Sequence, residues 1–445
     1  MPSTEKIGLA RGFVRALTKF YYPRIEVTGG HLIPRTGAVL LVANHPNSLI
    51  DPVLLGIAAQ RPVRLMAKAP LFDVPVFGDV LRSLGMVPAY RGTDDARQVA
   101  KNLESLSLAA RLLAGGAVMG IFPEGKSHDA TQLALVRSGA ARLAMQAVAA
   151  GAAELRVVPV GLNYERKERF RSAVWIKVGR PIDAANWLRM HAGDEHRAMR
   201  ALTQEINVRL RHCVTHLDDV AWESLLDELE AMLPPAPGGR RASLATLHRR
   251  KRASDAINFF HRAEPARAQQ AAAEVKAHAA ELRAAGVPPD ARVFALRGLA
   301  LWAVLLRDGG LMLAGGLVGL VGLLHHALPY ALVRVIVGRT AGPGRMVVAL
   351  HRLLASLPIY LLWYAFVWWR MRLYFVPWVA WTWIALMPFA GLAAIALRRR
   401  LRVMLPFWWA ELRLMFSRRA PALRAAHDRD GRKLEGYATE AKHPT

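Results

Sequence analysis

Two long uncharged segments near the C-terminal end most strongly limit what this chain can fold into. Residues 353–369 and 373–397 contain no Asp, Glu, Lys or Arg. A helix needs about 20 apolar residues, with a range of roughly 17 to 25, to cross the hydrocarbon core of a bilayer. Trp and Tyr crowd near the ends of both segments, as they do at membrane interfaces. We therefore predict two membrane-spanning helices joined by a tight turn at residues 370–372.

A third apolar segment, residues 311–333, comes before these two and is interrupted by two histidines and a proline. The tail that follows the last segment begins with three arginines at 398–400. Basic residues that flank membrane helices favour the cytoplasmic side. A cytoplasmic tail and a cytoplasmic N-terminal domain require an even number of crossings. We therefore expect residues 311–333 to be re-entrant or interfacial.

The overall charge points to an anionic partner. The chain has 60 Lys and Arg against 34 Asp and Glu, and yet 53% of its residues are hydrophobic. Excess positive charge suits nucleic acid or an anionic membrane, and the apolar content favours the membrane. No nucleic-acid recognition motif accompanies the charge. The single cysteine, Cys213, excludes an internal disulfide framework and a cysteine-rich metal site.

Residues 1–24 have the pattern of a basic amphipathic helix. Its basic stripe consists of Arg11, Arg15 and Lys19, and its apolar stripe of Leu9, Phe13, Leu17 and Phe20. Such a helix suits a membrane interface, where the basic stripe meets anionic lipid. The alternative is a helix packed on its own domain.

Residues 25–216 alternate short apolar runs with longer helical stretches, which predicts an α/β domain with a mixed sheet flanked by helices. The run 96–116 is one such helix, and its last two glycines are its stop signal. Residues 217–300 have a breaker-rich joint and an Ala-rich helix that starts at Pro265 and stops at Gly286. The predicted order is a basic helix (1–24), the α/β domain (25–216), a helical connector (217–300), a membrane region with two or three hydrophobic helices (301–416) and a basic tail (417–445).

The strand-like run that ends at Ala43 leads into His45, and Asp51 follows six positions later. The two side chains cannot meet on one regular helix, because each residue turns the helix by about 100°. They can meet if His45 lies at the strand end and Asp51 enters the next helix. A carboxylate behind an imidazole is the arrangement of a general base. The alternative is a loop histidine that is capped by chance.

The stretch GIFPEGKS, residues 120–127, has the spacing of a nucleotide-binding phosphate loop. Such a loop needs free backbone N–H groups between a strand and a helix. Here Pro123 has no N–H, and Glu124 would place a negative charge among phosphates. We therefore reject the nucleotide interpretation.

Four blocks in this part of the chain resemble, in order, the motifs of the PlsC-like superfamily of glycerophospholipid acyltransferases. They are NHPNSLIDP (44–52), GMVPAYRG (85–92), FPEGKS (122–127) and VVPVGLNY (157–164). The resemblance covers about residues 20–185. Most members have four residues between the motif histidine and aspartate, whereas here there are five. That variant is similar to a branch with yeast-type glycerol-3-phosphate and dihydroxyacetone-phosphate acyltransferases.

The resemblance implies direct acyl transfer, in which His45, oriented by Asp51, deprotonates a glycerol hydroxyl. Arg91 is then the first candidate for the acceptor's phosphate. The remaining substrate-binding candidates are Glu124, Gly125, Asn44 and Pro159. Second-rank phosphate candidates are Lys68, Lys126 and Arg137, for which a solvated surface charge is the alternative.

The partners so implied are an acyl thioester (acyl-CoA or acyl carrier protein), a phosphorylated glycerol-type acceptor and an anionic lipid membrane, without nucleic acid, cofactor or metal. The expected acceptor is glycerol 3-phosphate or dihydroxyacetone phosphate, and the alternative acceptor is lysophosphatidic acid. An alternative of another class is a non-catalytic membrane scaffold with the same fold. The expected location is a multi-pass membrane protein with its catalytic domain on the cytoplasmic face, in a bacterial inner membrane.

Overall fold

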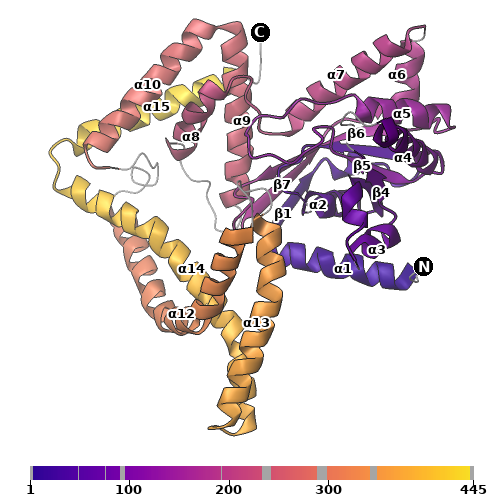
Figure 1. The fold of residues 1–445 in the computed structure, drawn as a ribbon. Helices are drawn as coiled ribbons and strands as arrows, with labels where there is room; N and C mark the ends of the chain where they lie inside the picture. Colours follow the sequence, from indigo (N-terminus) through magenta and orange to yellow (C-terminus); the bar gives the residue numbers. More distant parts are fainter. Residues whose placement is uncertain are drawn as a thin grey trace. The chain divides into compact units, whose positions relative to one another are not determined.

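The structure is a computed structural model that describes residues 4–48, 50–75, 77–90, 96–191, 193–232, 242–287, 298–340 and 348–440. It divides into two compact units. The first contains residues 1–220 with 238–251 and 344–349, and the second contains the remaining residues from 221 to 445. The first unit holds the sheet and its helices, and the second is helical (Figure 1).

The described part of the first unit contains a mixed eight-stranded sheet in the order β1-β7-β6-β2-β5-β3-β4, with β8 paired to β6. The strands are β1 (Arg24–Thr28), β2 (Val39–Ala43), β3 (Val63–Lys68), β4 (Val87–Ala89), β5 (Val118–Ile121), β6 (Arg156–Tyr164), β7 (Ala173–Val178) and β8 (Ile182–Asp183). Strand β2 pairs in parallel with β5 and β6, and β3 pairs in parallel with β5 and β4. The carboxyl ends of these five strands therefore lie at one edge, where open α/β sheets bind their ligands.

Helices accompany the strands, as the alternating pattern predicts. They are α1 (Thr4–Tyr21), α2 (Ile50–Ala59), α3 (Phe77–Ser83), α4 (Ala96–Ala114), α5 (Gly139–Ala149), α6 (Ala184–Met190) and α7 (Glu195–Cys213). On α4 the residues Leu106, Ala109, Ala110 and Leu113 are buried at helical spacing in the core of the sheet. The helix ends where predicted, and Gly116 takes the left-handed conformation (φ 80°) that suits glycine.

The described helices of the second unit are α8 (Glu223–Met232), the end of α9 (Ala242–Ala263), α10 (Pro265–Ala284), α12 (Gly298–Thr340), α13 (Val348–Arg372), α14 (Pro377–Met415) and α15 (Ala420–Glu440). Helix α10 begins at Pro265, as predicted. Gly286, with φ 69°, follows its end. Pro265 therefore starts this helix and Gly286 follows its end, as the sequence predicts.

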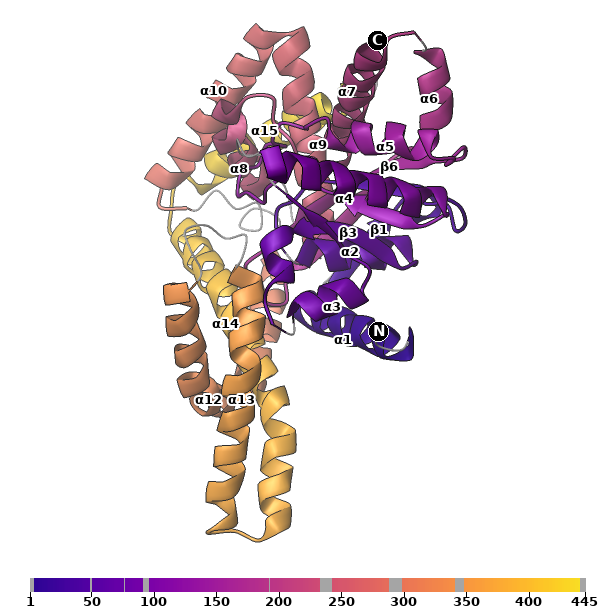
Figure 2. The same ribbon diagram turned by 45° about the vertical axis from the view of Figure 1, so that its right-hand side comes forward.

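Three helices in the described ranges are long and apolar enough to cross a membrane: α12, α13 and α14. Most of the predicted spans 353–369 and 373–397 lies in α13 and α14, but the predicted turn at 370–372 is wrong. Helix α13 continues to Arg372, and the short turn is at 373–376, before Pro377 starts α14 (Figure 2). Residues 311–333, expected to be re-entrant or interfacial, lie within α12, which also reaches spanning length. A Cβ on Gly322 of α12 would collide with the carbonyl of Ala390 on α14. Small residues thus let these two helices approach closely, as in membrane bundles.

Helix α1 contacts the rest of its domain through two of its basic residues. Arg15 donates from Nη2 to the Gly56 carbonyl of α2 at 2.7 Å, and Arg11 donates to the Leu84 carbonyl after α3 at 3.1 Å. Carbonyls at helix ends lack partners of their own and attract cations. Arg11 and Arg15 therefore contact their own domain, which is the alternative that the sequence leaves open, whereas Phe13 and Phe20 are 59% and 54% exposed.

Replacing Arg15 by alanine should lower the stability of the first unit, because it removes a charge-assisted bond to a helix terminus. The expected loss is about 1 to 2 kcal/mol in the free energy of unfolding. Thermal unfolding in detergent measures it. Lys19→Ala is the matched control, because Lys19 lies exposed on the same helix. Equal stability of the two variants would contradict the docking role of Arg15.

Candidate active site

The end of strand β2 is fastened to its neighbour β6 by Asn44. Its amide nitrogen donates to the Leu162 carbonyl at 3.1 Å, and its amide oxygen accepts from the Leu162 backbone N–H at 2.7 Å. These two bonds continue the parallel pairing of β2 and β6 one residue beyond the strand. The side chain of Asn44 thereby fixes the point at which the next residue, His45, leaves the sheet.

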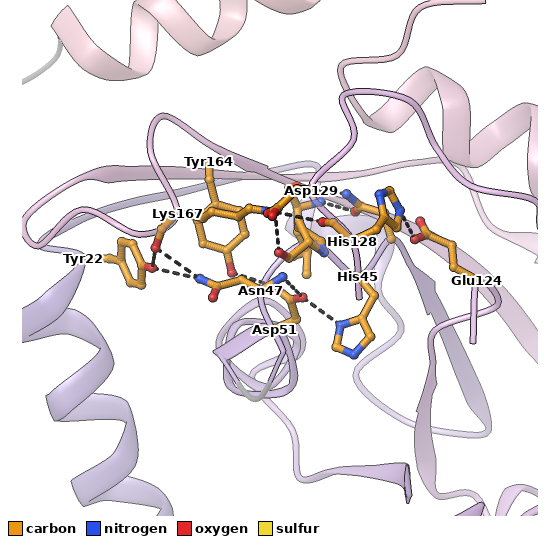
Figure 3. A network of polar contacts seen from close by, with 12 residues as sticks. Tyr22, His45, Asn47, Asp51, Glu124, His128, Asp129, Tyr164 and Lys167 are labelled. Carbon is orange, nitrogen blue, oxygen red and sulfur yellow. Dashed lines mark hydrogen bonds and ion pairs between the residues drawn. The ribbon is translucent and has the colours of Figure 1, made fainter. Parts of the chain in front are cut away.

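His45 and Asp51 meet as the sequence predicts, with the histidine beyond the strand end and the aspartate in the first turn of α2. His45 Nδ1 lies 2.8 Å from Asp51 Oδ2 (Figure 3). The Asp51 side chain is fully buried and accepts two more hydrogen bonds, from the Asn47 backbone N–H at 2.7 Å and from the Tyr164 hydroxyl at 2.6 Å. Three donors, two from the β2–α2 loop and one from the end of β6, therefore fix the orientation of this carboxylate.

The imidazole of His45 is also held from the side. Its ring stacks on Phe122, the residue after β5, with centroids 4.0 Å apart and planes 10° apart. Because Nδ1 serves Asp51, Nε2 is the nitrogen left to accept a proton. The side chain is 18% exposed, so it reaches the edge of the domain. This arrangement can act as a general base.

Sequence reasoning missed Tyr164, the last residue of the fourth motif. Burial, together with the nearby charge of Asp51, raises the pKa of its hydroxyl well above the ordinary value of 10. Tyr164 therefore keeps its proton and remains a donor to Asp51. The two residues are 113 positions apart, so no local sequence pattern predicts the contact. Asn47 extends the network by donating to the hydroxyl of Tyr22 at 2.8 Å.

Replacing Tyr164 by phenylalanine should keep the ring packing and remove one of the three donors to Asp51. A hydrogen bond to a charged group contributes about 1.5 to 3 kcal/mol, so we expect kcat to fall roughly tenfold or more. Tyr21→Phe makes the same chemical change at a hydroxyl that donates to the Glu168 carbonyl. Steady-state kinetics compare the two, and wild-type turnover in Tyr164→Phe would refute the positioning role.

The third motif forms the loop after β5. Glu124 is 2% exposed, and its Oε2 contacts His128 Nε2, an interaction that the sequence analysis did not foresee. Gly125 follows with φ 75°, a conformation that suits glycine. The next helix, α5, begins only at Gly139. A phosphate loop leads directly into its helix, so this geometry also excludes the nucleotide interpretation.

A buried lysine ties the first and third motifs together. Lys167 Nζ donates to the carbonyls of Pro46 and His128 at 2.8 Å each and lies 2.6 Å from Asp129 Oδ1. The backbone N–H of His128 also donates to the His45 carbonyl at 3.3 Å. The two loops are therefore held side by side. Sequence reasoning missed Lys167, because it lies in the hairpin after β6, outside every motif.

The remaining predicted residues lie at or near the same edge. Lys68 ends β3 and is exposed, as are Lys126 and Arg137. A Cβ on Gly125 would meet the Arg137 side chain at 3.7 Å, so that arginine lies beside the third motif. Pro159 is buried within β6 opposite Val42.

The first phosphate candidate, Arg91, lies outside the described residues. The strand before it, β4, pairs with the end of β3, Lys68 opposite Ala89. Within the described ranges, no cluster of three or more His, Cys, Asp or Glu side chains could hold a metal ion.

Cys213 is unsuited to covalent catalysis. It ends α7, is 1% exposed, and its sulfur lies where a Cβ on Gly179 would collide with it. Burial raises the pKa of its thiol to about 11. The reactive thiolate form is therefore disfavoured near neutral pH.

The family comparison agrees with this geometry. Residues 24–163 match the family model described as Acyltransferase, and they contain His45, Asp51 and the loop of Glu124. Tyr164 and Lys167 lie just beyond the matched range. Residues 24–163 are thus similar to an acyltransferase domain, and a helical region with three apolar helices of membrane-spanning length follows them in the chain.

Similar proteins cover only parts of the chain. An uncharacterised protein of Mycobacterium tuberculosis is 38% identical over 25% of this chain and 30% of its own length. Glycerol-3-phosphate O-acyltransferase 2 of Saccharomyces cerevisiae is 45% identical over 14% of this chain and 9% of its own. The 1-acyl-sn-glycerophosphate acyltransferase PlsC of Thermotoga maritima matches with 21% identity and a TM-score of 0.34, over 48% of this chain and 82% of that one. The match thus spans less than a third of each of the two curated relatives.

Proposed function

We propose that this protein is a membrane-bound O-acyltransferase that moves a fatty acyl group from a thioester to a phosphorylated glycerol-type acceptor. The observation that carries the proposal is the pairing of His45 with the fully buried Asp51 at the carboxyl edge of an acyltransferase domain. A base that is oriented in this way suits the deprotonation of a hydroxyl. A scaffold without activity would not require a carboxylate that orients an imidazole whose second nitrogen is left to accept a proton.

The reaction follows from the free nitrogen of His45. Nε2 takes the proton of the acceptor hydroxyl as its oxygen attacks the thioester carbonyl. The tetrahedral intermediate then collapses, so that the carbon–sulfur bond breaks while the new carbon–oxygen bond remains. The imidazolium returns its proton to the leaving thiolate. Asp51 stabilises the imidazolium while it exists, as in other carboxylate–histidine pairs. No acyl-enzyme forms, in keeping with the inert Cys213.

Glycerol 3-phosphate, or dihydroxyacetone phosphate, is the acceptor that we propose. Five residues separate His45 from Asp51, as in the branch that the sequence resembles, and the S. cerevisiae relative is named for glycerol 3-phosphate. Arg91 remains our proposed phosphate ligand, because a guanidinium can bind phosphate through two hydrogen bonds. Lysophosphatidic acid is the alternative acceptor. Purified protein should be offered all three acceptors with acyl-CoA and with acyl carrier protein, and the products identified by mass spectrometry.

His45→Ala and Asp51→Asn should each lower the rate of acyl transfer by about 10²- to 10⁴-fold, the usual loss when a general base is removed. Both variants should still insert into membranes, which fractionation checks. Asp51→Asn keeps the size of the side chain and changes its charge, so its effect reports on chemistry more than on packing. Near-normal turnover in His45→Ala would favour the non-catalytic scaffold.

We also propose that the acyltransferase domain faces the cytoplasm of a bacterium. Arginines at 398–400 follow the last apolar stretch, and such residues favour the cytoplasmic side. Two crossings would place both chain ends on that side, whereas three would separate them. Terminal tags on the protein in sealed inverted vesicles should both be cut by added protease if two helices cross. Protection of one tag only would indicate three crossings.

A further inference from the structure

The loop after β5 contains a second histidine–carboxylate pair beside the first. Glu124 Oε2 contacts His128 Nε2 across four residues, and the two side chains are 0% and 18% exposed. In Figure 3 this pair lies near His45 and its partner Asp51. The proposed base chemistry uses only His45 and Asp51, so the second pair has no role in it.

Each member of this pair has one buried polar atom left over. Glu124 Oε1 and His128 Nδ1 form no hydrogen bond with any part of the chain that the structure describes. A buried polar atom without a partner is unfavourable, and in native proteins it marks a strained, catalytic or ligand-binding position. Here the two atoms belong to adjoining side chains, which indicates a ligand with both acceptor and donor groups.

The position of His128 is fixed relative to the proposed base. Its N–H donates to the His45 carbonyl, and Lys167 bridges its carbonyl to that of Pro46. Phe122, two residues before Glu124, stacks on the imidazole of His45. A molecule that contacts His128 is therefore bound next to the loop that carries the proposed base.

Charge determines which group of the acceptor suits this position. The carboxylate of Glu124 alone would repel a phosphate. An imidazole with a proton on each ring nitrogen can donate to Glu124 from Nε2 and to an anionic oxygen from Nδ1. The exposed cations Lys126 and Arg137 lie in the same loop and add positive potential. The free Oε1 of Glu124 is suited to accept a hydrogen bond from a hydroxyl of the same molecule.

We propose that His128, oriented by Glu124, donates a hydrogen bond from Nδ1 to the phosphate of the acceptor. Glu124 then acts on the phosphate through His128. This inference rests on the proposed acyl transfer, and it identifies the acceptor as a small phosphate monoester with a free hydroxyl. His128 is thus a binding residue, distinct from the base His45.

The test uses full-length protein in detergent. His128→Gln should raise the KM for glycerol 3-phosphate, and the inhibition constant of inorganic phosphate, by roughly 10- to 150-fold, the factor expected for a charge-assisted bond. The kcat and the KM for the thioester should stay close to wild type. Glu124→Gln should change the same constants, and the double variant should be no worse than the more affected single variant, because the two residues act as one unit.

His31→Gln is the matched control, since His31 is exposed on the short helix Gly30–Leu32. Melting temperatures confirm folding, and His128→Asn provides a second variant if His128→Gln is unstable. Equal losses with glycerol 3-phosphate and with unphosphorylated glycerol would overturn the phosphate assignment. So would a loss confined to kcat, which would make His128 a proton donor to the leaving thiolate.

Calorimetric binding of glycerol 3-phosphate separates this inference from the proposed reaction, because it needs no turnover. Wild type should bind the compound, and His128→Gln should bind it more weakly by the same factor. Wild-type protein that binds the phosphate but transfers no acyl group would reject the reaction and keep the binding site. Equal affinity of wild type and His128→Gln would reject the binding site, whatever the activity.

Discussion

The three hydrogen bonds to Asp51 are the interaction on which the site depends. An ionised carboxylate deep in a domain is strongly unfavourable unless donors surround it. Here the donors come from the β2–α2 loop and from the end of β6, so the carboxylate links segments that are distant in sequence. The parallel pairing of β2 with β6, continued by Asn44, brings them together. The orientation of the proposed base therefore depends on the pairing of β2 with β6.

Local patterns predict most of the fold because their causes are local. The stop of α4 at its glycines, the start of α10 at Pro265 and the apolar segments of α13 and α14 all follow from backbone chemistry or hydropathy. The orientation of α1 could not be predicted in this way. Its outward face depends on which carbonyls neighbouring helices leave open, and Gly56 and Leu84 are distant in sequence from Arg15 and Arg11.

The distinction between local and long-range contacts also explains which residues of the site the sequence predicts. His45 and Asp51 are six residues apart, so strand and helix geometry alone indicate that they can meet. Tyr164 and Lys167 reach the same place through the sheet, and their contacts cross more than a hundred residues. Glu124 and His128 have helical spacing but lie in a loop, which no periodicity marks. Residues that orient others are thus harder to predict than the residues they orient.

Lys167 has a consequence beyond holding the loops. Because one ammonium group binds the carbonyls of Pro46 and His128 together, the loop of the base and the loop of the proposed phosphate site cannot move independently. A molecule that shifts the loop of His128 on binding therefore also shifts the position of the His45 loop. By thermodynamic reciprocity, the state of the base must then influence how tightly that molecule is held. Binding of the acceptor's phosphate at one loop and of its hydroxyl at the other would then be energetically coupled through Lys167.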